Sequence, residues 1–158
     1  MEFGARALGN RSIMANAEDW RVVKIINEMI KQRDFWRPFA PSILGECASE
    51  YLLKPKDVSA PYMILSFDTV PDKIERMIAA VHPYDGTARP QEVYRDWNEG
   101  YYEVLENFRS KTGEGVILYT WFNLHGSPIV YSPTYALEVF MDSPMRHLVL
   151  GDLLISKK

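Results

Sequence analysis

The 158-residue sequence contains a single cysteine, Cys47. One cysteine excludes an internal disulfide and is typical of proteins from a reducing compartment. No uninterrupted apolar run approaches the roughly 20 residues that a membrane-spanning helix needs. The start of the chain, Met1–Gly4, has neither the basic residues nor the apolar core of a signal peptide. We therefore expect a soluble, cytoplasmic protein that has no membrane partner.

The sequence also has no excess of positively charged residues. The 18 Lys and Arg residues are outnumbered by 21 Asp and Glu residues, which gives a net charge of −3. This balance argues against a nucleic-acid partner, but it leaves room for a local anion site. The three histidines are far apart in the sequence, and no Gly-x-Ser-x-Gly elbow occurs. The sequence thus predicts neither a metal site nor a nucleophile of a known local pattern.

The composition that remains is that of an ordinary globular domain. Hydrophobic residues make up 47% and charged residues 25% of a chain whose length fits one domain, spanning residues 1–158. A helix is predicted after Asn16 as N-cap, with an apolar stripe as far as Ile30 and its last turn at Lys31 and Arg33. A second is predicted over 98–112, before Gly113, and a third from 132, with Ala136, Leu137 and Phe140 turned inward.

Strand-like apolar runs lie between these helices. They are Tyr62–Phe67, Val116–Phe122, Pro128–Tyr131 and His147–Ile155. Short strands interleaved with helices predict an α/β or α+β fold. Because some connections, such as Asn123–Ser127, are as short as a hairpin, we expect a sheet of mixed strand direction.

A cluster of cations follows the first predicted helix. Lys31, Arg33 and Arg37 lie within seven residues, among the aromatic side chains and prolines of the run 35–41. Rigid packing around cations suits a phosphate site, because it fixes the donors before the ligand arrives. The alternative is capping of the helix C-terminus, which would account for Lys31 and Arg33 but not for Arg37 beyond the helix.

Three further segments could contribute to a binding site. Glycines flank Arg6 in the run 4–12, Thr87 and Arg89 follow an Asp-Gly turn, and Asn123 ends a predicted strand. A backbone that approaches a ligand closely next to a guanidinium suits an anion. Taken alone, each segment is better explained by a polar turn or loop with solvated side chains.

Taken together and in this order, these segments resemble the C-terminal domain of the O-carbamoyltransferase family, which includes the nodulation-factor and antibiotic carbamoyltransferases. The matching runs are EFGARALGNRSI, IKQRDFWRPFAPSIL, YDGTARPQEV, FNLHGSPIV, SPTYAL and LVLGDLLISK. The resemblance implies a YrdC-like fold, a twisted mixed sheet flanked by helices.

The resemblance also implies an activity. In such enzymes this domain joins carbamoyl phosphate to ATP, which carries Mg²⁺, and forms carbamoyl adenylate with release of phosphate and pyrophosphate. A separate N-terminal domain, similar to the Kae1 type and binding iron, then transfers the carbamoyl group to a hydroxyl. We expect that partner domain to belong to the same polypeptide, outside the present sequence.

The family's functional residues map onto matching positions of this sequence. The resemblance implies catalytic roles for Lys31, Arg33 and Arg37. It implies binding of carbamoyl phosphate and ATP by Arg6, Lys31, Arg37, Thr87, Arg89 and Asn123. Clustered cations suit both ligands, because together these bring several negative charges into one site.

The sequence departs from the family pattern most clearly at Trp121. The family's SxN motif has a serine at this position, whereas Asn123 is kept. An indole offers one N–H donor and fills more volume than a serine hydroxyl. This departure motivates an alternative function, a non-catalytic nucleotide-binding or phosphate-binding scaffold that retains the fold.

Overall fold

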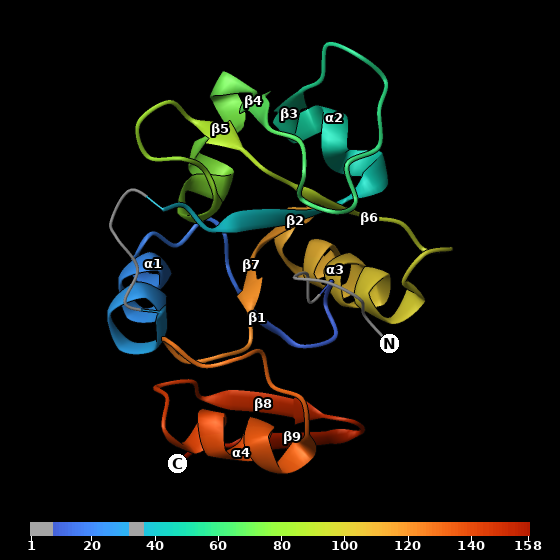
Figure 1. Cartoon of the computed structure of the whole chain (residues 1–158). Helices are drawn as coiled ribbons and strands as arrows, with labels where there is room; N and C mark the ends of the chain where they lie inside the picture. The colour runs from blue at the N-terminus through green and yellow to red at the C-terminus, as the bar shows by residue number, and fades with distance from the viewer. Residues whose placement is uncertain (1–7, 32–36) are drawn as a thin grey trace.

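The computed structural model describes residues 8–31 and 37–158, and its centre is a four-stranded sheet (Figure 1). The strand order is β1 (Ser12–Ala15), β7 (Val116–Trp121), β2 (Ala40–Leu44), β6 (Gln91–Val93). β7 is antiparallel to both neighbours, whereas β6 is parallel to β2. The predicted α/β class with a mixed sheet is confirmed. β1, β2 and β6 were not expected from the sequence.

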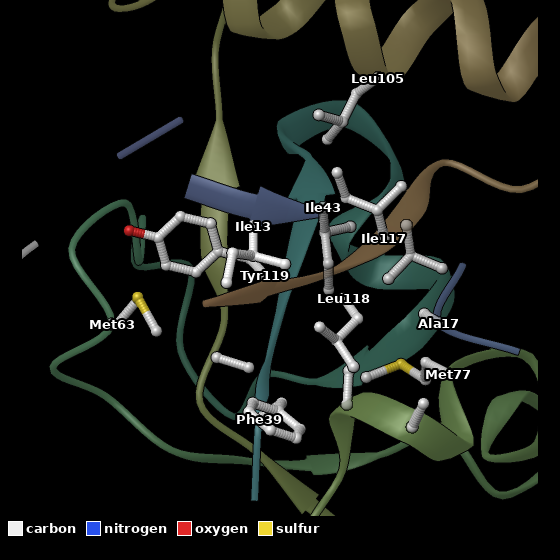
Figure 2. Packing of buried hydrophobic residues seen from close by; sticks show 14 of the residues in the cluster. Ile13, Ala17, Phe39, Ile43, Met63, Met77, Leu105, Ile117, Leu118 and Tyr119 are labelled. Atoms are coloured by element: carbon white, nitrogen blue, oxygen red, sulfur yellow. The ribbon is translucent and has the colours of Figure 1, made fainter. Parts of the chain in front are cut away.

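The two central strands are apolar on both faces because both faces are covered. All five residues of β2 and five of the six residues of β7 are buried. Helix α3 (Glu99–Thr112) supplies Leu105 to one face, and the 3₁₀ segment Glu75–Ala80 supplies Met77 to the other. Figure 2 shows Leu105 on the side of Ile117 and Met77 on the side of Leu118.

The second and third predicted helices are confirmed. In α3 the side chain of Asn98 accepts a hydrogen bond from the Tyr101 N–H, and Gly113 ends the helix with φ of 85°. In α4 (Pro133–Met141) the Ser132 hydroxyl accepts from the Tyr135 N–H. Leu137 is exposed rather than turned inward, because the buried face of this short helix is Ala136, Val139 and Phe140.

The first helix starts later than predicted. It comprises α1 (Arg21–Ile26) and a π-helical turn, Asn27–Lys31. The Asn16 side chain accepts from the Glu18 N–H, and the Asp19 side chain accepts from the Arg21 N–H. Short polar side chains of this kind stabilise turns in competition with a helix, so Asn16 forms a turn before the helix instead of its cap.

The remaining strands form two small sheets. β3 (Leu52–Leu53), β4 (Phe67–Thr69) and β5 (Thr87–Ala88) form one, and β8 (His147–Leu150) pairs with β9 (Leu153–Ser156) in the other. The predicted strand 147–155 is thus a hairpin that turns at Gly151, where φ is 58°. The predicted strand 62–67 is wrong except for its last residue, and 128–131 contains no strand. The segment 123–127 does not join two paired strands.

No helix in the described ranges 8–31 and 37–158 has both the length and the apolar character to cross a membrane.

Candidate anion site at one end of the sheet

The topology gathers four strand ends at one end of the central sheet. Trp121 at the end of β7 pairs with Ser12 at the start of β1, and Tyr119 pairs with Ala40 at the start of β2. β6 runs parallel to β2, so its start lies at the same end. Neighbouring strands are about 4.8 Å apart, and the four ends therefore span about 15 Å.

Cationic residues border each of these strand ends. Arg11 precedes β1, Arg37 lies three residues before β2, and Arg89 lies two residues before β6. Lys31 reaches the end of β7 from the π-helical turn. We call this group, together with Asn123 after β7, the cationic end of the sheet.

Lys31 is the most buried member, with 4% of its surface exposed. Its ammonium group donates to the Trp121 carbonyl oxygen at 2.5 Å and to the Asn123 carbonyl oxygen at 3.0 Å. It also contacts the side-chain oxygen of Asn123. These oxygens belong to a segment 90 residues away in sequence, so Lys31 is not a simple cap of its own helix.

The segment after β7 is held against the end of the first helix. The His125 N–H donates to the Ile30 carbonyl at 2.9 Å, and His125 Nδ1 lies 2.8 Å from the Lys31 carbonyl oxygen. The Asn123 amide group donates to the carbonyls of Leu124 and Ser127. Lys31 and Asn123, both predicted as site residues, are therefore in direct contact where this loop meets the π-helical turn.

The two predicted arginines of this end are exposed. Arg37 and Arg89 both present their side chains at the surface, where solvent anions can approach them. A guanidinium can bind two phosphate oxygens at once, with the geometry of a fork. The cationic end thus combines a buried ammonium group with exposed guanidinium groups on neighbouring strands.

Thr87 lies close to Arg89 but in the small sheet of β4 and β5. Its N–H and hydroxyl both donate to Asp85 Oδ1, at 2.9 and 2.8 Å. These hydrogen bonds from Thr87, backbone first, hold the pKa of Asp85 below its usual value. The hydroxyl of Thr87 thus stabilises its own turn, and it can act on a ligand only as an acceptor or by giving up Asp85.

Arg6 and Arg33, the other two predicted cations, lie outside the described residues. Arg11, which the sequence argument did not select, lies at the same end of the sheet and donates to the Val130 carbonyl at 3.1 Å. Its place beside Ser12, in the same run as Arg6, was the signal that could have identified it. Among the described residues, no group of three His, Cys, Asp or Glu side chains is arranged to hold a metal ion.

A cavity of about 780 Å³ is lined by residues of β1, α1 and the segment 144–151. Its walls include the apolar side chains of Ile13, Ile26, Val130 and Leu148. Arg11 and Arg146 also line this cavity, whose wall is otherwise mostly apolar. The strand ends bring more cationic residues together than this wall does, so the cationic end of the sheet remains the candidate anion site.

Comparison with known proteins decides the family. Residues 1–157 match the family described as the carbamoyltransferase C-terminus. The chain belongs to this family. The chain is 40% identical to the nodulation protein NolNO of Sinorhizobium fredii and 38% identical to the nodulation protein NolO of Bradyrhizobium diazoefficiens, in each case over 99% of its length. It is 38% identical, over its whole length, to an uncharacterized protein of Methanocaldococcus jannaschii.

The chain corresponds to a minor part of the length of these relatives. It spans 23% of the Sinorhizobium protein, 29% of the Bradyrhizobium protein and 26% of the Methanocaldococcus protein. In those proteins the matched region is therefore one part of a much larger polypeptide.

Trp121, the main departure from the family motif, is half-buried at the end of β7 and packs against the core. The contact that Lys31 makes at this position is to the backbone carbonyl oxygen. A backbone contact does not depend on which side chain the residue carries. The replacement of serine by tryptophan therefore leaves this part of the cationic end in place.

Proposed function

We propose that this carbamoyltransferase domain activates carbamoyl phosphate with ATP and Mg²⁺ to form carbamoyl adenylate. The observation that carries the proposal is the position of Lys31, Arg37, Arg89 and Asn123 at one end of the sheet, in a chain of the carbamoyltransferase family. Two anionic substrates must approach each other there, and clustered cations lower the repulsion between them.

The reaction needs one water molecule for its atoms to balance. Water releases inorganic phosphate from carbamoyl phosphate and leaves carbamate. A carbamate oxygen then attacks the α-phosphorus of ATP, and the bond from that phosphorus to the departing pyrophosphate breaks. Arg37 and Arg89 would bind phosphate oxygens, while Lys31 would hold the Asn123 loop and supply positive charge. Arg33 and Arg6 would complete the set. Mg²⁺ would be carried mainly by the phosphates, as is usual for this ion.

A second reaction would complete the transfer. An iron-binding, Kae1-like domain of the same polypeptide would accept carbamoyl adenylate and pass the carbamoyl group to a hydroxyl. The small share of the relatives that this domain covers supports a larger enzyme.

The test is substitution of Arg37, which is exposed and can be removed without opening the core. Arg37→Ala should weaken binding of carbamoyl phosphate and ATP by at least ~10-fold, because a charge-assisted hydrogen bond contributes about 1.5–3 kcal/mol. Calorimetry measures binding, and release of pyrophosphate from ATP, Mg²⁺ and carbamoyl phosphate measures the reaction.

Arg95→Ala is the matched control. Arg95 is also exposed, but it precedes α3 and pairs with Glu99 and Glu103 at 3.6 Å. Arg95→Ala should leave both measurements unchanged. Equal binding by wild type and Arg37→Ala would remove Arg37 from the site.

The alternative function is a non-catalytic phosphate-binding scaffold, favoured by Trp121 in place of the motif serine. The two functions differ in one observable. A scaffold binds the ligands but releases no pyrophosphate, and Trp121→Ser would then be the variant that restores release.

A further inference from the structure

A cluster of three aromatic rings lies next to β6, on a part of the surface to which the proposed function assigns no role. Tyr62 and Trp97 are nearly parallel, with ring centroids 6.3 Å apart and an angle of 14° between their planes. Tyr94 meets Trp97 at 5.1 Å. Trp97 is 54% exposed and Tyr62 is 50% exposed, although both are large apolar side chains.

These rings border a pocket of about 400 Å³. Asn10, Gln91 and Asn98 also line the pocket, and the Asn98 amide is already bonded to the Tyr101 N–H and the Leu8 carbonyl. Gln91 is buried, with 4% of its surface exposed, and its side-chain oxygen accepts from the Ser42 hydroxyl at 3.3 Å. A planar aromatic face beside a fixed amide group is the combination by which proteins bind a nucleobase.

The walls of the pocket are held in place before any ligand arrives. Glu92 has a fully buried side chain and pairs with Lys54 at 2.8 Å. The same carboxylate accepts from the Tyr94 hydroxyl at 2.6 Å and from the Ala60 N–H at 2.9 Å, which ties the segment before Tyr62 to β6. Burial, followed by the hydrogen bond to Glu92, raises the pKa of Tyr94, so its hydroxyl keeps its proton at neutral pH.

Two residues that line the pocket lie next to the cationic end in sequence, because Asn10 precedes Arg11 and Gln91 begins β6, whereas Tyr94 and Trp97 follow the last residue of β6. Arg89 lies two residues before Gln91, so their Cα atoms are at most about 7 Å apart. A phosphate bound by the Arg89 guanidinium and a base beside Gln91 are therefore within the reach of a single nucleotide.

We infer that Tyr62, Tyr94 and Trp97 form the subsite for the base of the nucleotide whose phosphates bind at the cationic end. The inference rests on the proposed function and adds where the nucleoside lies. Two stacking distances need about 7 Å, which exceeds the 6.3 Å between the Tyr62 and Trp97 centroids. The base therefore does not lie between the two rings but stacks on the exposed part of the Trp97 indole.

The experiment compares ATP with inorganic tripolyphosphate, which has the phosphate chain but no base. Wild type should bind ATP more tightly than tripolyphosphate. Trp97→Ala should lose roughly 10-fold in ATP affinity, in the range of one lost base-stacking contact, and should bind tripolyphosphate as wild type does. Trp97→Phe keeps an aromatic face and should recover most of the ATP affinity.

Trp20→Ala is the matched control, because Trp20 is 51% exposed but lies before α1, outside the lining of the pocket. It should bind ATP like wild type. Tyr62→Ala, as a second variant in the pocket, should weaken ATP binding without changing tripolyphosphate binding. Circular dichroism verifies that each variant is folded.

The outcomes separate this inference from the proposed function. If Trp97→Ala releases pyrophosphate with an unchanged KM for ATP, the base subsite is wrong and the proposed reaction stands. If Trp20→Ala loses as much ATP affinity as Trp97→Ala, the subsite is also wrong. If wild type binds neither ATP nor carbamoyl phosphate and releases no pyrophosphate, the proposed function and the subsite both fail.

Discussion

At the scale of single residues, Lys31 connects helix geometry to the candidate site. A buried ammonium group is costly unless it is fully hydrogen-bonded. Here it finds oxygens of Trp121 and Asn123, while the ring and N–H of His125 bind the last carbonyls of the same helix. The π-helical turn Asn27–Lys31 is consistent with a functional position, because such turns occur often at functional sites. Lys31 therefore fixes the loop that carries Asn123.

Cys47 predicts how the stability of the fold depends on pH. Burial raises the pKa of this thiol to about 11 from 9.0, since the apolar core disfavours the thiolate. The folded state therefore holds this proton more tightly than the unfolded state. The resulting stability is complete below pH 9 and is lost as pH rises toward 11, by an amount on the order of 2 kcal/mol.

Urea unfolding at pH 8 and pH 10.5 measures this loss. Cys47→Ala should lose less stability between the two pH values than wild type. An identical loss in both proteins would show that other groups, such as buried tyrosines, carry the alkaline effect.

At the scale of elements, the two capped helices were the most predictable parts of the fold. Asn98 and Gly113 delimit α3, and Ser132 begins α4, as their residue types indicate. A cap acts through hydrogen bonds to residues a few positions away, so its signal is complete in the local sequence. Strand β2 shows the opposite case. Its Pro41 argues against a central strand, yet it is accommodated because pairing with β6 starts only at Ser42.

The caps predict unequal losses of stability. Asn98→Ala removes the cap of α3 and also the hydrogen bond from the Asn98 amide to the Leu8 carbonyl, at 2.8 Å. Ser132→Ala removes only the cap of α4. We expect Ser132→Ala to lower the free energy of unfolding by about 1 kcal/mol and Asn98→Ala to lower it by about 2 kcal/mol, as measured by urea denaturation. Equal losses would mean that the bond to Leu8 contributes nothing.

At the scale of the whole molecule, residues 132–158 form a unit of their own. This unit of α4, β8 and β9 lies below the rest of the chain in Figure 1. Within the described part of the chain, its hydrogen bonds stay inside the unit, as in the bonds from Lys157 to the carbonyls at the end of α4. It meets the central sheet across the apolar cavity lined by Ile13 and Leu148.

The rates of amide hydrogen exchange should therefore differ between this unit and the central sheet. The β8–β9 hairpin is exposed on the face of Val149 and Leu154, whereas β2 and β7 are buried on both faces. Amides of β8 and β9 should exchange at least ~10-fold faster than those of β2 and β7, because local opening of the unit breaks few contacts. Uniform protection across the chain, measured by mass spectrometry, would show that the unit opens only with global unfolding.

The sequence alone determined the fold class, the two capped helices and the segments of the candidate site, because these depend on residue type and short-range spacing. Only the tertiary structure decided that Lys31 contacts Asn123 and that Arg37 and Arg89 border the same end of the sheet. It also brought Tyr62 next to Trp97. The physical reason is that strand order and register set which distant residues meet, and they depend on how all the apolar faces are buried together.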